Sequence, residues 1–137
     1  MMLGLVLLVK RSEYANLSVP KMFCATAKKH PDKTMFYFEE ETWTFKQMDE
    51  FSNKIANYFL GLGYTKGDAV ALFMTNRPEY VAFILGLSKI GVIPALINYN
   101  LKQESLLHSI EVSKCRGVLF GAELKEGLNK SYSILST

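Results

Sequence analysis

The sequence predicts an α/β fold: a partial doubly wound parallel sheet with a leading helix and a β-hairpin. The main observation is a strand–helix–strand pattern in residues 69–97. Residues 69–74 are a continuous apolar run, typical of a strand covered on both faces. Apolar residues then recur at helical spacing up to Gly91, and residues 92–97 form a second apolar run. This pattern predicts a right-handed βαβ unit.

The helix of this unit is expected to begin at Asn76 and to end at Gly91. Asn caps helices well, Pro78 falls in the first turn, and the Glu79 carboxylate favours a helix N-terminus. Arg77 could attract phosphate at this position, but a solvated arginine is the favoured interpretation. Glycine is the usual residue just after a helix.

Residues 18–63 are expected to form a helix, a hairpin and a second helix. Pro20 suits the first turn of a helix that follows Ser18. Residues 35–38 and 42–44 are short strands joined by an acidic turn. Thr44 and Gln47 have the spacing of a capping box. The second helix is expected to bury one stripe, made of Met48, Phe51, Ile55, Tyr58, Phe59 and Leu62.

A further βα repeat follows the opening unit. Residues 102–113 predict a helix, residues 116–120 a third central strand, and residues from 123 onward another helix. Ligands of open α/β sheets bind beyond the carboxyl ends of the strands. Asn98 and Asn100 directly follow the second predicted strand, so they could contact a ligand there. Turn chemistry is the favoured interpretation of these two residues. The apolar members of the 102–113 helix are Leu106, Leu107, Ile110 and Val112.

The composition indicates a globular domain and gives no sign of a nucleic-acid-binding or metal-binding protein. The 137 residues are 49% hydrophobic and 21% charged, which indicates one globular domain. The net charge of +3 is spread among acidic residues, so no basic face for nucleic acid is expected. Cys24 and Cys115 lack the spacing of a metal or redox site and are expected to be free thiols. No metal site is predicted.

The first nine residues are apolar and precede Lys10 and Arg11. Crossing a bilayer takes about 20 helical residues, so this run is too short to span. We interpret residues 1–11 as the remnant of a membrane anchor with its basic end on the cytosolic side. A short arm that packs on protein is the alternative. Residues 12–130 are assigned to the folded domain and residues 131–137 to an irregular tail.

Several short motifs occur in a fixed order along the chain. They are Trp43-Thr-Phe45, Gly63-Tyr-Thr-Lys-Gly-Asp68, Thr75-Asn-Arg-Pro-Glu79, Gly91 and Leu96-Ile-Asn-Tyr-Asn-Leu-Lys102. In this order they resemble the amino-terminal part of adenylate-forming, AMP-binding acyl-CoA synthetases. The 98–102 stretch and Val118-Leu-Phe-Gly121 are most similar to the fatty acid transport protein (very-long-chain acyl-CoA synthetase) branch. The resemblance covers residues 17–128.

The resemblance implies a two-step ligase reaction. A fatty acid carboxylate attacks the α-phosphate of ATP, and the thiol of coenzyme A then displaces AMP. The family uses ATP, Mg²⁺ and coenzyme A, with phosphates held by a Ser/Thr/Gly-rich loop that ends in Lys. No such loop occurs in this chain, so no catalytic residue is predicted and the chain alone is expected to be inactive. By family position, three residues are candidates for a place near coenzyme A: Gly121, Lys125 and Lys130.

Further expectations follow from the same resemblance. The chain is expected to be an amino-terminal fragment of such a synthetase, associated with the cytosolic face of the endoplasmic reticulum or plasma membrane. Fatty acid and the membrane surface are the expected partners, together with a second copy or a full-length synthetase. The alternative function is that of a non-catalytic short isoform, which would bind full-length synthetase or membrane lipid.

Overall fold

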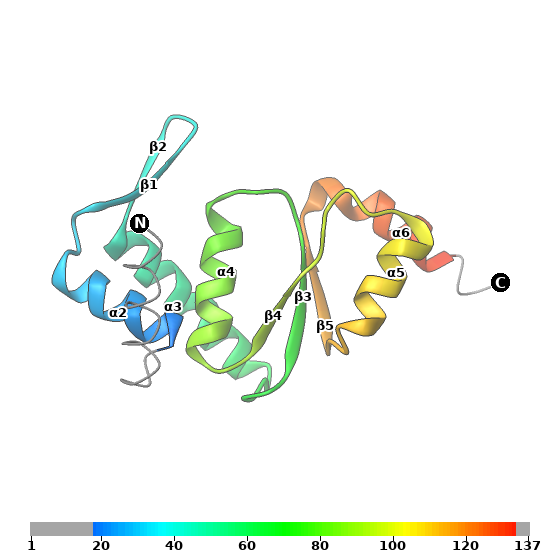
Figure 1. Cartoon of the computed structure of the whole chain (residues 1–137), viewed down its shortest axis with the longest axis horizontal. Coiled ribbons are helices and arrows are strands. Elements are labelled where there is room, and N and C mark those ends of the chain that lie inside the picture. The colour runs from blue at the N-terminus through cyan, green and yellow to red at the C-terminus, as the bar shows by residue number, and fades with distance from the viewer. Residues whose placement is uncertain (1–17, 134–137) are drawn as a thin grey trace, which may run out of the picture. The chain divides into compact units, whose positions relative to one another are not determined.

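A computed structural model describes residues 18–133 (Figure 1). The chain divides into two compact units, residues 1–49 and residues 50–137, which we describe separately. The predicted anchor remnant at residues 1–11 lies outside the described residues. The tail predicted from residue 131 begins as helix, because α6 runs to Ser133, and its last four residues are also outside the described part.

The first unit contains α2 (Val19–Lys29), β1 (Thr34–Phe38) and β2 (Glu41–Thr44). The two strands pair antiparallel, which confirms the predicted hairpin. Its turn places Glu39 at φ 51°, a left-handed conformation without the usual Asn-Gly chemistry. Phe36 and Trp43 stack across the strands with ring centroids 6.4 Å apart.

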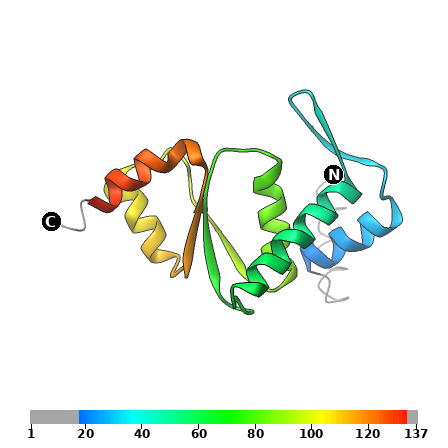
Figure 2. The ribbon, with the colours of Figure 1, turned by 180° about the vertical axis from the view of Figure 1, so that it is seen from behind.

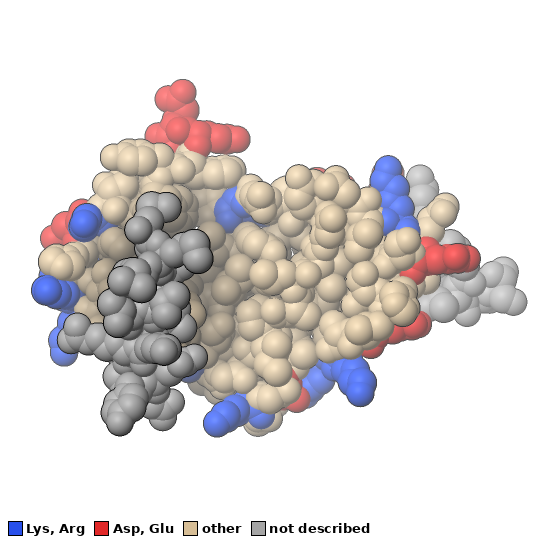
Figure 3. Space-filling view, in the orientation of Figure 1, with Lys and Arg blue, Asp and Glu red and all other residues tan. Residues whose placement is uncertain are grey.

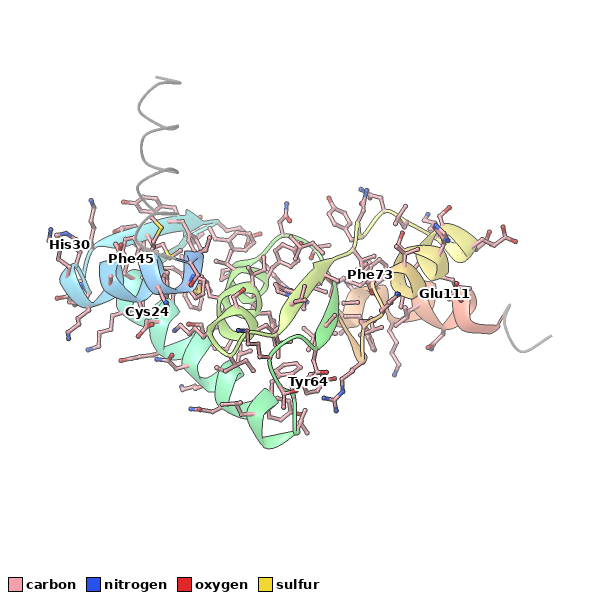
Figure 4. The ribbon with its side chains drawn as sticks, turned by 60° about the horizontal axis from the view of Figure 1, so that its bottom comes forward. Cys24, His30, Phe45, Tyr64, Phe73 and Glu111 are labelled. Carbon is pink, nitrogen blue, oxygen red and sulfur yellow. The ribbon has the colours of Figure 1, made fainter. Side chains whose placement is uncertain are left out.

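Helix α3 (Phe45–Gly61) begins in the first unit and continues into the second. The predicted capping box is confirmed: the Thr44 N–H donates to Gln47 Oε1 at 2.8 Å, and the Gln47 N–H donates to Thr44 Oγ1 at 3.2 Å. The ring of Phe45, which is labelled in Figure 4, lies near that of Phe23 of α2. The two ring centroids are 6.1 Å apart.

The stripe predicted for α3 is partly wrong. Met48, Ile55 and Phe59 are buried as expected, but Tyr58 and Leu62 are more than half exposed. The smaller residues Ser52 and Ala56 are buried on this helix instead. The reason is close packing against α4: a Cβ on Gly86 would lie 2.7 Å from the Ser52 carbonyl oxygen.

A three-stranded parallel sheet forms the centre of the second unit. Its strands are β3 (Ala69–Phe73), β4 (Ile93–Leu96) and β5 (Gly117–Phe120), in the order β4-β3-β5. In register, Ala71 pairs with Ala95 of β4 and with Val118 of β5. Every residue of β3 is buried, as its unbroken apolar run predicts. The predicted parallel sheet is therefore confirmed.

Helices cover both faces of this sheet (Figures 1 and 2). Helix α4 (Pro78–Lys89) and the later part of α3 lie on one face, and α5 (Gln103–Val112) and α6 (Lys125–Ser133) lie on the other. The core under α5 and α6 contains Ala71, Phe73, Ile97, Leu106, Ile110 and Leu128. Val112 is 66% exposed, so its predicted place on the apolar face of α5 is wrong. It lies at the last residue of the helix, beyond that core.

Candidate functional site

The carboxyl ends of the three parallel strands meet at one edge of the sheet. Three loops leave this edge: residues 74–77 lead into α4, residues 97–102 lead into α5, and Gly121 leads into the 3₁₀ helix η1 (Ala122–Leu124). Open α/β sheets bind their ligands at such an edge. The side chains of these three loops therefore form the candidate site.

The start of α4 differs from the prediction. The helix begins at Pro78 with Arg77 as its N-cap residue, and neither Arg77 nor Asn76 makes the predicted capping bond to the helix. Pro suits the first helical position, and it forces the residue before it into an extended conformation. Arg77 has φ −163° and ψ 167°, so the extended residue is the one immediately before Pro78. Asn76 is exposed one residue earlier.

Arg77 is not simply solvated, which corrects the second prediction for this loop. Its side chain is 31% exposed, and Nη1 lies 3.6 Å from Oε2 of Glu123 in η1. The Thr75 hydroxyl donates to Oε1 of the same carboxylate at 3.1 Å. Within residues 18–133, Arg77 Nε is a buried nitrogen without a hydrogen-bond partner. The Thr75–Arg77–Glu123 cluster thus joins the loops that follow β3 and β5.

The Glu123 carboxylate is held in its ionised form. Its own backbone N–H is the main cause that lowers its pKa, followed by the Thr75 hydroxyl and the positive charge of Arg77. Partial desolvation acts in the opposite direction. The carboxylate also lies against Gly121, where a Cβ would collide with it. Glycine at this position therefore lets the carboxylate fold back toward Thr75.

A cavity of about 260 Å³ opens beside this cluster, at the ends of β3 and β4. Its walls combine apolar and aromatic side chains with two amides. The lining residues are Met74, Asn76, Tyr80, Leu96, Ile97, Asn98 and Tyr99. Burial raises the pKa of the Tyr80 hydroxyl, which indicates a poorly hydrated wall on the α4 side. The arrangement suits a small ligand with an apolar body and a hydrogen-bonding group.

Asn98 has a structural role in this edge. Its Oδ1 accepts the N–H of Asn100 at 3.0 Å, the pattern of an Asx turn. The prediction of turn chemistry for the two asparagines is confirmed. Asn98 also lines the cavity, while Asn100 is exposed and does not.

The three residues predicted near coenzyme A leave the same edge. Gly121 is buried, its N–H donates to the Phe73 carbonyl at 3.0 Å, and it lies next to the Glu123 carboxylate. Lys125 is exposed at the first residue of α6, and Lys130 belongs to the same helix with its side chain outside the described part. The role of these residues stays a prediction.

A second polar cluster, which we did not predict, lies at the amino ends of the strands. Arg116 Nη1 donates to Asp68 Oδ2 at 2.6 Å and to the Gly63 carbonyl at 3.1 Å, and its guanidinium lies 4.5 Å from the centre of the Tyr64 ring. The backbone N–H of Thr65 is the main cause that lowers the Asp68 pKa, followed by Arg116. We call Tyr64, Asp68 and Arg116 the amino-edge cluster (Tyr64 is labelled in Figure 4). Asp68 and Arg116 are 48 positions apart, so no local pattern marks the pair.

Residues 18–133 contain no cluster of side chains suited to bind a metal ion. No three side chains of His, Cys, Asp or Glu lie together there in a way that could hold an ion. Cys24 is exposed and Cys115 half-buried, and both are free thiols, as predicted.

Comparison with known proteins identifies relatives of this chain. The family model described as "AMP-binding enzyme" matches residues 23–135. Long-chain fatty acid transport protein 1 of Rattus norvegicus is 38% identical over 90% of this chain and 20% of its own length. Long-chain fatty acid transport protein 2 of the same species is 40% identical over 80% of this chain and 18% of its own length. The chain thus spans about a fifth of the length of these relatives.

Solved structures share the fold. The N-terminal domain of FACL13 from Mycobacterium tuberculosis superposes with a TM-score of 0.76 and 26% identity. The match covers 81% of this chain and 28% of that domain. Within residues 18–133, no helix is both long and apolar enough to cross a membrane.

Proposed function

Because the chain belongs to the AMP-binding enzyme family, we propose that it forms the amino-terminal scaffold of a fatty acyl-CoA synthetase linked to fatty acid transport. The observation that carries the proposal is its 38% identity to rat long-chain fatty acid transport protein 1 over 90% of this chain. The shared fold with the N-terminal domain of FACL13 supports the same assignment. The amino-terminal fragment predicted from the sequence agrees with the family match.

The proposed reaction of the complete enzyme has two steps. The fatty acid carboxylate attacks the α-phosphate of ATP, which forms an acyl-adenylate and releases pyrophosphate. The thiol of coenzyme A then attacks the acyl carbon and releases AMP, and the thioester forms. Cations and hydrogen-bond donors aimed at the phosphates lower the barrier of such a transfer. ATP, Mg²⁺ and coenzyme A are therefore the proposed cofactors of the complete protein.

This chain is proposed to contribute support and no reacting group. The sequence has no Ser/Thr/Gly-rich loop that ends in Lys. Within the described residues, no three side chains of His, Cys, Asp or Glu are placed so that they could hold a metal ion. The sheet brings the Thr75–Arg77–Glu123 cluster and the cavity to the edge where ligands bind in this class of fold. We infer that these loops support one wall of the ligand site in a complete enzyme.

Membrane association is part of the proposal. The relatives are named as fatty acid transport proteins. Residues 1–9 of the chain are apolar and precede Lys10 and Arg11, a pattern that suits contact with an anionic membrane surface. The proposed location is the cytosolic face of the endoplasmic reticulum or the plasma membrane.

A chimeric enzyme tests the scaffold role. Residues 23–135 would replace the matching segment in a full-length relative that forms acyl-CoA from oleate, ATP and coenzyme A. We expect acyl-CoA formation within about tenfold of the parent, because the same fold is restored. A soluble, folded chimera without activity would contradict the proposal. The matched control carries Phe73→Lys in the transplanted sheet and is expected to be inactive.

The isolated chain provides the complementary measurement. Under the same assay we expect no acyl-CoA above background, because the phosphate-binding loop is missing from its sequence. Turnover that depends on both ATP and coenzyme A would refute the proposed division of roles.

A further inference from the structure

The outer face of helix α2 carries positive charge and no acidic residue. Three lysines of this helix are exposed: Lys21, Lys28 and Lys29. They are seven and eight positions apart, which places them on one side of a helix. Phe23 and Ala27, the buried residues of α2, lie on the opposite side. Residues 18–31 include no Asp or Glu, so nothing on the helix itself offsets these charges.

Helix stability explains only part of this pattern. Cations in the last turn favour the negative end of the helix dipole, which accounts for Lys28 and Lys29. The same dipole disfavours a cation in the first turn, so it does not account for Lys21. It does not explain the exposed apolar residues either, since Val19 is 70% exposed and Met22 is 41% exposed. These two are three positions apart and therefore lie on the same side of the helix start.

The acidic residues of the first unit are concentrated away from α2. Glutamates 39–41 form the turn of the β1–β2 hairpin, and all three are exposed. Figure 3 shows this acidic hairpin tip at the top of the view. The other acidic residues described in this unit are Asp32, which follows the helix, and Asp49, whose Oδ1 lies 4.0 Å from Cys24 Sγ. The outer face of α2 is therefore the positive side of the unit.

An anionic membrane surface has the chemistry that matches this face. Lysines near such a surface are attracted to its lipid headgroups, and their flexible apolar stems let the ammonium groups reach them. Exposed apolar side chains such as Val19 and Met22 can enter the boundary between headgroups and acyl chains. Nucleic acid would pair with the lysines but would leave the two apolar side chains in water. The combination of charges and apolar side chains therefore favours lipid.

We propose that the outer face of α2 docks on an anionic membrane surface. Lys28 and Lys29 would contact the headgroups, while Val19 and Met22 would enter the boundary to the acyl chains. The proposal rests on the membrane association in the proposed function, and it names a surface of the folded chain that makes the contact. This surface is distinct from residues 1–11, because it depends on the side chains that α2 turns away from its buried residues.

Sedimentation of the full chain with lipid vesicles tests the proposal. Phosphatidylcholine vesicles with about 30% phosphatidylserine provide the anionic surface, and pure phosphatidylcholine vesicles are the neutral reference. Lys28→Glu combined with Lys29→Glu is expected to weaken binding to the anionic vesicles by about tenfold or more, because two attractions become repulsions. Binding to the neutral vesicles should stay unchanged. Added salt should reduce the difference between the two proteins, since it screens exposed charges.

A matched control reverses two charges elsewhere. Lys102 and Lys114 are exposed lysines of the second unit, and Lys102→Glu combined with Lys114→Glu gives the same net charge as the α2 variant. A general effect of net charge would weaken the binding of both double variants equally. We expect the control to bind the anionic vesicles within about threefold of the unmodified chain, because its substitutions lie outside the docking face. Far-UV circular dichroism verifies that each variant is folded.

A fluorescent label shows whether α2 itself contacts the bilayer. Ala25 is exposed on the same side of α2 as the lysines, so Ala25→Cys can carry the label once Cys24 and Cys115 are replaced by Ser. On anionic vesicles we expect brominated lipids to quench this label, because the label would lie at the bilayer surface. A label at Val112→Cys is the control, since Val112 is 66% exposed on α5, and it should not be quenched.

Several results would overturn the proposal. Unchanged binding of the α2 double variant would leave residues 1–11 as the membrane contact, and equal weakening of both double variants would indicate a general charge effect. An unquenched label at position 25 on the bound chain, or tighter binding to soluble polyglutamate than to the vesicles, would also contradict it. An unmodified chain that binds no anionic vesicles would contradict membrane association itself. None of these measurements uses acyl-CoA formation, so the chimera test of the proposed function stays independent.

Discussion

The two ends of the parallel sheet are built differently. At the amino end, Arg116 contacts Asp68, the Gly63 carbonyl and the Tyr64 ring at the same time. At the carboxyl end, Arg77 makes a long contact of 3.6 Å with Glu123, and its buried Nε has no hydrogen-bond partner among residues 18–133. A cavity of about 260 Å³ lies beside it.

The difference separates two roles within one sheet. Short, multiple contacts at the amino end hold the loop before β3 to the start of β5. At the carboxyl end, a cavity and a polar group that lacks a partner are left next to the strand ends, and such features are typical of binding regions. The comparison predicts that mutations at the amino end act mainly on stability, and that the surface of the carboxyl end tolerates change.

The largest expected effect distinguishes the core of the carboxyl end from its rim. Phe73 and Phe120 pair in register, but Phe73 is 2% exposed and Phe120 is 39% exposed. Phe73→Ala should lower the free energy of unfolding by about 3–5 kcal/mol, because it leaves a cavity in the core. Phe120→Ala should cost about 1 kcal/mol, since part of its surface already contacts water. Urea unfolding measures both, and equal losses would contradict the packing described here.

A smaller effect should separate the two arginines. Arg116→Ala is expected to lower the free energy of unfolding by about 1 kcal/mol, because it removes a cation–π contact and two partly exposed hydrogen bonds. Arg77→Ala should change it by about 0.5 kcal/mol or less, since a long, partly exposed ion pair contributes little. Arg116→Lys keeps the charge but loses the planar stacking, so it should fall between them. A larger loss of stability for Arg77→Ala than for Arg116→Ala, in thermal or urea unfolding, would contradict the proposed difference between the two ends.

Acid should weaken the amino-edge cluster. The folded-state pKa of Asp68 lies below its ordinary value of 3.8, so the unfolded chain binds its proton more readily. The resulting stability is present above pH 3.8 and is lost as the pH falls through the folded-state pKa. Asp68→Asn should therefore reduce the loss of stability on acidification, compared with the unmodified chain. Identical pH profiles of unfolding for the two proteins would show that this carboxylate does not contribute.

The smallest effect concerns the wall of the cavity. The pKa of Tyr80 is raised above its ordinary value of 10.0 because the hydroxyl is partly buried. Ultraviolet titration of the folded chain should include a tyrosine fraction that ionises late, and Tyr80→Phe should remove it. The late fraction should also disappear in denaturant, since burial is its cause. If Tyr80→Phe still contains tyrosine that ionises at high pH, the buried hydroxyl belongs to another tyrosine.

Much of the fold could be predicted from local signals. The apolar run of β3, the capping box at Thr44 and the helix end at Gly91 each depend on a few neighbouring residues. Gly91 has φ +76°, and the Val92 N–H returns to the Leu87 carbonyl at 3.0 Å, as expected after a helix. The parallel pairing of the three strands could be predicted because strands and helices alternate along the chain.

The site could be predicted less well, because its contacts join distant parts of the sequence. Arg77 and Glu123 come from different loops, and nothing near either residue indicates the other. The cap predicted at Asn76 was wrong because Pro78 determined the start of α4 more strongly than the preference of Asn for capping. The asparagine turn was predictable, since Asn98 and Asn100 are two residues apart.

Amide hydrogen exchange of the full chain, measured by NMR, tests the sheet and its open edge most directly. Slow exchange is expected for the N–H groups of Ile93 and Arg116, which donate across the strands at 2.8 Å. Fast exchange is expected for the Leu96 N–H, which faces the outer edge of β4, where no described strand pairs. A Leu96 amide as protected as that of Ile93, or rapid exchange at Ile93 and Arg116, would contradict this arrangement of the strands.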